Sequence, residues 1–122
     1  LVKGEPRKMS SLAEVTVFRV VQESLSNIHR HSQAEHASIT LEFDHNHLDL
    51  DIQDDGIGFA QPERFSAYAE RNKLGLIGME QRILAIGGTL DLQSSPGMGT
   101  HLHAAIPYMV SDELVQVDET HL

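Results

Sequence analysis

The stretch DDGIGF, residues 54–59, places two carboxylates and two glycines directly after a predicted strand. In that strand, from Leu48 to Gln53, the even-numbered residues are apolar and the odd-numbered residues are polar. Because successive side chains of a strand point to opposite faces, Asp54 continues the apolar, core-facing phase. A carboxylate without a partner on that side costs several kcal/mol. We therefore expect Asp54 to bind a polar partner.

An adenine ring fits the surroundings that the sequence predicts for Asp54. Thr100 falls on the core-facing phase of the last strand, so a second polar group faces inward at a strand end. The exocyclic amine of adenine donates to a carboxylate, whereas guanine presents an oxygen there and leaves two acceptors facing each other. Aliphatic contacts for the faces of the ring are available from Ile57, Met79 and Leu102.

Three glycine clusters follow predicted strands or begin a predicted helix, where backbone amides can approach phosphate oxygens closely. The amino end of that helix also attracts anions. A single glycine pair at a turn is more often structural than functional. The ordered set predicts a phosphate-binding pocket, and its members are Gly56, Gly58, Gly75, Gly78, Gly97 and Gly99.

Residues 12–31 have helical periodicity, with an expected apolar stripe of Phe18, Val21, Leu25 and Ile28. The opposite face carries Thr16, Glu23, Asn27 and Arg30, with His31 at its margin. An amide oxygen from Asn27 suits Mg²⁺, and Glu23 suits a proton acceptor or a group that orients water. Arg30 offers positive charge to phosphate oxygens. An ordinary solvated helix face is the alternative for Glu23 and Asn27 taken alone.

The remaining patterns predict an α+β fold, a two-layer α/β sandwich in which helices cover one face of a mostly antiparallel mixed sheet. Residues 37–43 alternate as a strand that pairs with the strand from Leu48. A polar lid over 58–75 precedes a helix that starts near Leu74 and ends at two glycines, and strands over 89–94 and 100–107 follow. We expect residues 1–11 to be a linker or truncated edge, 12–108 the binding domain, and 109–122 a disordered acidic tail.

Composition limits the partners of this chain of 122 residues. Its formal net charge of -9 argues against nucleic acid as the main partner, since phosphate backbones bind basic surfaces. The absence of cysteine excludes disulfides and thiolate metal sites. No apolar stretch approaches the length of a membrane span, so we expect no direct membrane contact by this segment.

Histidine pairs suggest a different kind of site. His45 and His47 flank one residue, as do His101 and His103, but the first pair lies in a predicted turn and the second on the outward strand phase. A histidine metal site needs three or four converging ligands with support around them, which the spacing does not assemble. Surface histidines are the preferred interpretation.

Four motifs, QESLSNIHRHSQA, DDGIGF, GLIGMEQR and GMGT, resemble in order and interval the nucleotide-binding motifs of the GHKL ATPase superfamily. The resemblance is nearest to the catalytic ATP-binding domain of bacterial two-component sensor histidine kinases, in the subgroup paired with helix-turn-helix response regulators. It covers about Leu12 to Pro107. It implies the Bergerat fold, with Mg²⁺ and ATP bound beneath a lid.

By motif position, the resemblance implies that Asn27 is the metal ligand, Glu23 the catalytic base, and Arg30 and His31 the basic end of the first motif. It makes Asp54 the adenine contact with Thr100 beside it, and the six glycines, Ile57, Leu76 and Met79 pocket residues. Some relatives have a further glycine where this chain has Lys73, which we expect to stiffen the lid or to contact phosphate.

The resemblance implies a histidine kinase domain that donates the γ-phosphoryl group of ATP to a histidine on a separate dimerisation domain, and signals indirectly to a response regulator. His29 is expected to pack toward the apolar side of its helix, so this chain has no acceptor and should not autophosphorylate alone. We expect a cytoplasmic location, possibly as part of a membrane-anchored sensor. A GHKL-fold ATP-binding regulator or an anti-sigma-type serine kinase is the alternative.

Overall fold

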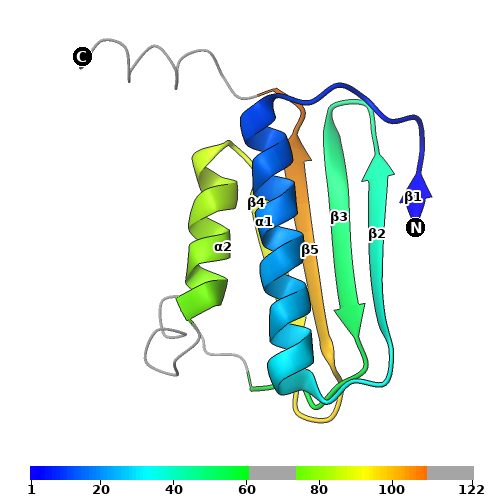
Figure 1. Ribbon diagram of the computed structural model, residues 1–122, viewed down its shortest axis with the longest axis vertical. Helices are drawn as coiled ribbons and strands as arrows, with labels where there is room; N and C mark the ends of the chain where they lie inside the picture. The colour runs from blue at the N-terminus through cyan, green and yellow to red at the C-terminus, as the bar shows by residue number, and fades with distance from the viewer. Residues whose placement is uncertain (61–73, 110–122) are drawn as a thin grey trace.

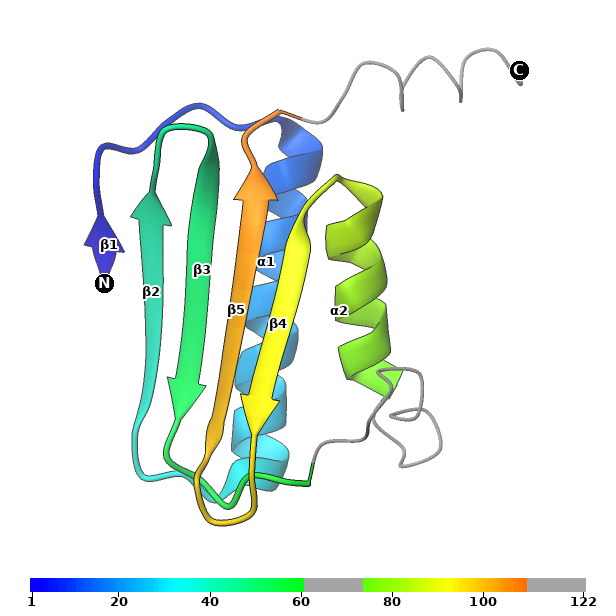
Figure 2. The ribbon, with the colours of Figure 1, turned by 180° about the vertical axis from the view of Figure 1, so that it is seen from behind.

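The computed structural model describes residues 1–60 and 74–109 as a single five-stranded sheet with two helices packed on one face (Figure 1). Figure 2 shows the opposite face of the sheet, which none of the helices in the described ranges covers. The predicted α+β sandwich is therefore confirmed. Its elements in chain order are β1 (Val2–Lys3), α1 (Ser11–Asn27), the π-helix η1 (Ile28–Ser32), β2 (Ala37–Phe43), β3 (His47–Asp54), α2 (Leu74–Ala85), β4 (Thr89–Ser94) and β5 (Thr100–Pro107).

The strands lie in the order β1-β2-β3-β5-β4, and every pair except the parallel β1–β2 pair is antiparallel. The central β3–β5 pairing sets Asp54 directly opposite Thr100. Residues 1–11, expected as a linker, contribute the edge strand β1, whose Val2 pairs with Leu41. Ser10 then caps α1 by accepting a hydrogen bond from the amide of Ala13.

The alternation predicted for the strands matches their burial. In β3, Leu48, Leu50 and Ile52 are buried beneath the helices, and the core-facing residues of β5 meet them from the next strand. On the helical side, α2 contributes Leu76, Met79 and Ile83 to the same core. Because the core has this one side, the odd-numbered residues of β3 lie on the uncovered face.

The apolar stripe predicted for α1 is wrong for two of its four residues. Phe18 is 63% exposed and Leu25 is 44% exposed, although Val21 and Ile28 do pack at the edge of the core. The buried face instead carries small residues that allow the helix to lie close to the sheet and to α2, namely Ala13, Thr16, Val20 and Ser24. Their hydroxyls are paired: Thr16 donates to the carbonyl of Leu12, and Ser24 contacts the sulfur of Met79 at 3.6 Å.

The end of α1 also differs from the prediction. Regular α-helix stops at Asn27 and continues as η1, so helical spacing from residue 12 does not apply to residues 28–32. His29, expected to pack against the core, is exposed. Gln33 ends η1 in the left-handed conformation with φ of 54°.

Helix α2 (Leu74–Ala85) ends as the sequence predicts. The amides of Gly87 and Gly88 donate to the carbonyls of Leu84 and Ile83, which is the Schellman arrangement of a glycine stop. The predicted lid falls mostly on residues 61–73 and the acidic tail on 110–122, which lie outside the described residues. Within the described part of the chain, none of the helices is both long and apolar enough to cross a bilayer.

Candidate functional site

A cavity of about 620 Å³ lies between α1, α2 and the adjoining ends of β3 and β5. Eleven of the residues predicted for the site line it, and they come from segments far apart in the sequence. They are Glu23, Asn27, Arg30, His31, Asp54, Ile57, Gly58, Gly75, Leu76, Met79 and Thr100. The fold therefore brings most of the predicted site to one place.

Asp54 stands at the end of β3 with its side chain half-buried. One carboxylate oxygen, Oδ1, accepts a hydrogen bond of 2.9 Å from the amide of Gly56. Within residues 1–60 and 74–109, no group donates to the second oxygen. Across the strand pair, the hydroxyl of Thr100 shares a hydrogen bond of 2.8 Å with that of Ser94. The cavity thus has one carboxylate oxygen available for a ligand.

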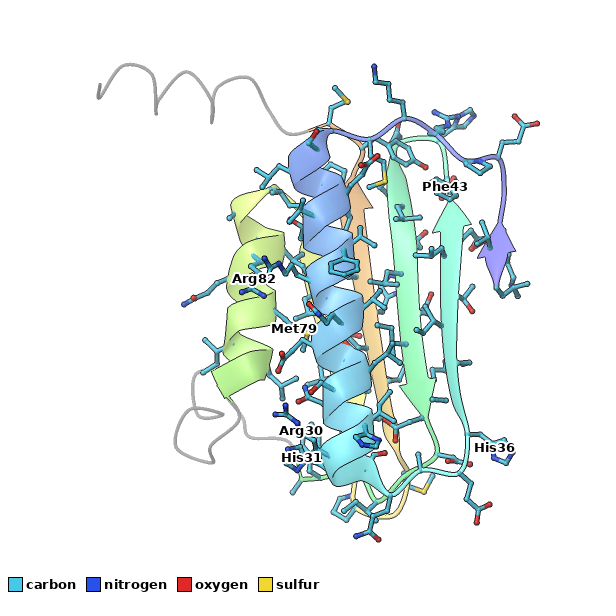
Figure 3. The ribbon with its side chains drawn as sticks, in the orientation of Figure 1. Arg30, His31, His36, Phe43, Met79 and Arg82 are labelled. Carbon is cyan, nitrogen blue, oxygen red and sulfur yellow. The ribbon has the colours of Figure 1, made fainter. Side chains whose placement is uncertain are left out.

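The wall around this carboxylate is apolar. Met79 is 1% exposed and Leu102 is 4% exposed, and both line the cavity from opposite layers. Ile57 is half exposed at the rim. Figure 3 shows Met79 between α1 and α2. A flat ring fits against such a wall while its polar edge meets Asp54.

The other end of the cavity is polar. Glu23 and Asn27 are partly exposed, one helical turn apart on α1, and Arg30 and His31 are exposed on η1. The labelled side chains of Arg30 and His31 lie at the carboxyl end of the α1–η1 helix in Figure 3. Among the described residues, none forms a side-chain hydrogen bond or ion pair with these four. They form a polar surface that is free to meet an anionic ligand and its counter-ion.

Gly75, in the first turn of α2, leaves room for Glu23. A Cβ atom added at Gly75 would lie 2.3 Å from Oε1 of Glu23, closer than any real contact. The glycine therefore lets the amino end of α2 and the carboxylate of Glu23 share one corner of the cavity.

The π-helix is joined to the DDGIGF stretch by backbone contacts. The amide of Ile57 donates to the carbonyl of Ser32 over 2.7 Å, and the carbonyl of Ile57 accepts from the amide of Gly97 over 2.6 Å. Gly56 is buried at this contact. A side chain would not fit there, because an added Cβ atom would lie 2.2 Å from the Ser32 carbonyl oxygen. Gly56 thus supports the cavity wall and does not line it.

The remaining predicted residues lie elsewhere. Gly78 is on α2 but outside the cavity, and Gly97 lies in the turn between β4 and β5. Gly99 lines a smaller cavity of about 300 Å³ on the other side of Asp54 and Thr100. Lys73 lies outside the described residues.

Several lining residues were not predicted as site residues: Ser24, Ile28, Ser32, Ile52, Phe59 and Leu92. Ile28 and Ile52 carried a signal because both lie on predicted apolar faces, and Phe59 did because it lies in the stretch DDGIGF. Ser24 and Ser32 reach the cavity from buried helix positions that apolar periodicity passes over.

Asp55, next to Asp54, faces away from the cavity and holds the connection from η1 to β2. Its Oδ1 accepts from the amides of Glu35 and His36, both at 2.9 Å, and its Oδ2 lies 3.0 Å from the His36 ring. The backbone amide of His36, followed by its ring, lowers the pKa of Asp55 below the usual 3.8. The carboxylate form is thus favoured by folding.

We therefore expect Asp55→Asn to destabilise the domain at neutral pH and to have less effect in acid. With the folded-state pKa below the unfolded value, the stabilisation is complete above 3.8 and is lost as pH falls through the folded pKa. Urea unfolding midpoints of wild type and variant should differ at neutral pH and converge in acid. Asp91→Asn is the matched control, and a gap that stays constant with pH contradicts the assignment.

Comparison with known proteins places these features in a family. The family model described as histidine kinase-, DNA gyrase B-, and HSP90-like ATPase matches residues 13–109. DegS of Bacillus subtilis, a signal transduction histidine-protein kinase/phosphatase, is 34% identical over 104 residues, which are 84% of this chain and 26% of DegS. A sensor-like histidine kinase of Chloroflexus aurantiacus is 32% identical over 101 residues, 82% of this chain and 17% of that protein. This chain thus spans about a quarter or less of these relatives.

Solved structures show the same fold. The histidine kinase domain of a blue-light activated kinase from Erythrobacter litoralis aligns with a TM-score of 0.66 at 21% identity, covering 88% of this chain and 53% of that one. The ATP binding domain of PrrB from Mycobacterium tuberculosis aligns with a TM-score of 0.62 at 24% identity, covering 77% of this chain and 68% of that one.

Proposed function

This chain belongs to the histidine kinase-, DNA gyrase B-, and HSP90-like ATPase family, as an ATP-binding domain of the histidine kinase type, and from that premise we propose how its cavity works. The cavity binds ATP with Mg²⁺, the adenine at Asp54 and the phosphates at the α1–η1 end. The observation that carries this assignment is the Asp54 carboxylate, which has one oxygen available for a ligand and lies beside an apolar wall. Four polar side chains without partners among the described residues lie at the opposite end of the cavity.

The adenine end follows from the acceptor that Asp54 leaves available. Since Oδ1 is held by the Gly56 amide, the second oxygen is the one that receives the exocyclic amine of adenine. Met79 and Leu102 contact the faces of the ring, and Thr100 adds a hydroxyl beside the carboxylate. A guanine in the same place would set its oxygen against that acceptor.

The phosphate end follows from charge and donor type. Arg30 and His31 offer positive charge or N–H donors to phosphate oxygens, as does Lys73 by its place in the motif. The amino end of α2 at Gly75 adds backbone amides. The amide oxygen of Asn27 is the protein ligand for Mg²⁺, a cation that neutralises phosphate charge when bound.

Glu23 is the proposed catalytic base. It stands four residues before Asn27 on the same helix face and lines the cavity, so it is positioned to accept a proton from an incoming nucleophile or to orient water. We propose that the nucleophile is a histidine of a dimerisation domain belonging to the same kinase, and that a response regulator is the later recipient. Such a reaction takes place in the cytoplasm, where ATP is available.

Phosphotransfer to a supplied acceptor tests this proposal. The chain is mixed with γ-labelled ATP and the dimerisation segment of its own kinase, and acid-labile, base-stable phosphohistidine is measured. We expect labelling by wild type and a rate at least about 100-fold lower for Glu23→Gln, with ATP affinity retained, because a positioned base contributes at least that factor. Glu14→Gln, on the first turn of the same helix, is the matched control.

The outcomes separate the proposal from its alternatives. Selective ATP binding without phosphohistidine contradicts histidine transfer and favours an ATP-binding regulator. Label that appears on serine of a partner identifies a serine kinase instead. Labelling that is unaffected by Glu23→Gln removes that residue as the base.

A further inference from the structure

The uncovered face of the sheet carries a chain of alternating histidines and aspartates that the ATP site does not use. His101 Nε2 and His103 Nδ1 lie 2.8 Å and 2.9 Å from the same oxygen of Asp51. His103 Nε2 lies 3.3 Å from Asp49 Oδ1, and His47 Nε2 lies 3.2 Å from Asp49 Oδ2. Three imidazoles from β3 and β5 thus meet two carboxylates of β3, on the face that Figure 2 presents.

One end of this chain has the geometry of a metal site. Asp44, His47 and Asp49 each offer a ligand atom, and these atoms lie within 4.8 Å of one another. Asp44 comes from the turn before β3, and the other two come from one face of β3. Among the described residues, no other such group of three is present.

His103 lies beside this group without being part of it, since its ring bridges Asp49 and Asp51. Because an ionised carboxylate only accepts hydrogen bonds, the contact of Nδ1 with Asp51 places the proton on Nδ1. Its Nε2 faces the second carboxylate, that of Asp49.

We propose that this face binds a divalent transition-metal ion of the Zn²⁺ type through Asp44, His47 and Asp49, with the remaining position left to water. The imidazole of His47 favours Zn²⁺ over Mg²⁺, which prefers oxygen ligands alone. The net charge of -9 further favours cation binding. The site is separate from the nucleotide cavity, since Leu48 and Leu50 between its strand residues face the opposite layer.

Histidine spacing did not predict this group, because His45 of the first pair is not part of it. Asp44 and Asp49 take part instead, and the turn before β3 brings Asp44 to the face of the strand that carries the other two residues.

Zn²⁺ titration without nucleotide tests the proposal. Calorimetry of the metal-free chain should show one Zn²⁺ ion bound per chain, unaffected by millimolar MgCl₂, and the thermal midpoint should rise with Zn²⁺. We expect His47→Gln and Asp49→Asn each to weaken binding at least about tenfold. His36→Gln is the control, because that histidine has a single carboxylate partner, Asp55.

A second measurement does not depend on variants. In wild type, the side-chain ¹⁵N resonances of His47 should shift with Zn²⁺ while those of His29 and His36 stay in place. Absence of binding overturns the proposal. So does binding that survives both His47→Gln and Asp49→Asn, or that is lost equally in His36→Gln, since either result marks adventitious binding to surface histidines.

Discussion

Asp54→Asn is expected to lower the affinity for Mg²⁺·ATP by about 10- to 100-fold, the cost of losing a hydrogen bond to a charged acceptor. The wild-type carboxylate serves two donors, with Oδ1 held by the Gly56 amide and the second oxygen left for adenine. Asparagine has one acceptor oxygen, so either the turn at Gly56 or the adenine amine loses its partner. Calorimetric titration of wild type and variant with Mg²⁺·ATP measures the change.

Titration with Mg²⁺·GTP and a second variant make that experiment specific. Wild type should prefer ATP, and Asp54→Asn should lose most of this preference, because the amide of asparagine can donate to the guanine oxygen. Asp91→Asn makes the same chemical change at an exposed position of β4 and should leave ATP binding unchanged. Equal ATP affinity in wild type and Asp54→Asn, with both folded, would place adenine elsewhere.

Gly99→Ala is expected to destabilise the domain by about 2 to 5 kcal/mol, the sum of a left-handed backbone penalty and steric overlap. Gly99 has φ of +73°, and a Cβ atom there would lie 2.1 Å from the carbonyl oxygen of Asp54 and 3.1 Å from the Cα of Asp55. These are backbone atoms of the adjoining strand end, so no side-chain rotation relieves the overlap. Urea unfolding with wild type as reference gives the difference in free energy.

Gly97→Ala is the matched control for this effect. Gly97 has φ of +78° in the same turn, but nothing lies within 4 Å of an added Cβ atom. We expect only the backbone penalty, about 1 to 2 kcal/mol. If the two variants are equally stable, the close approach of Gly99 to Asp54 has no energetic consequence, and the geometry of this turn is wrong.

The two glycines show what resemblance leaves undecided. Both belong to the motif GMGT, and both were predicted as pocket glycines. In the structure the amide of Gly97 holds the turn by donating a hydrogen bond to the carbonyl of Ile57. Gly99 instead allows β5 to begin close to the backbone of Asp54. Only the fold distinguishes a glycine needed for its backbone angle from one needed also for a close contact.

The sequence by itself determined the strands and the main chemistry of the cavity. Residues 37–43, 89–94 and 100–107 form the predicted strands. A sheet with one buried and one open face requires apolar and polar residues to alternate along each strand, and this pattern is visible in the sequence. The same count placed Asp54 on the inner phase, and the structure sets it at the cavity. The adjacent glycines Gly87 and Gly88 likewise predicted where α2 ends.

Tertiary structure decided what packing and pairing control. Helix α1 buries Ala13 and Thr16 while exposing Phe18, because its close approach to the sheet and to α2 selects small side chains over large ones. The π-helical turn after Asn27 changed where His29 points, since helical spacing no longer holds there. The meeting of Asp49 with His103 depends on the β3–β5 register. Such contacts join residues more than fifty positions apart, a distance over which local periodicity carries no information.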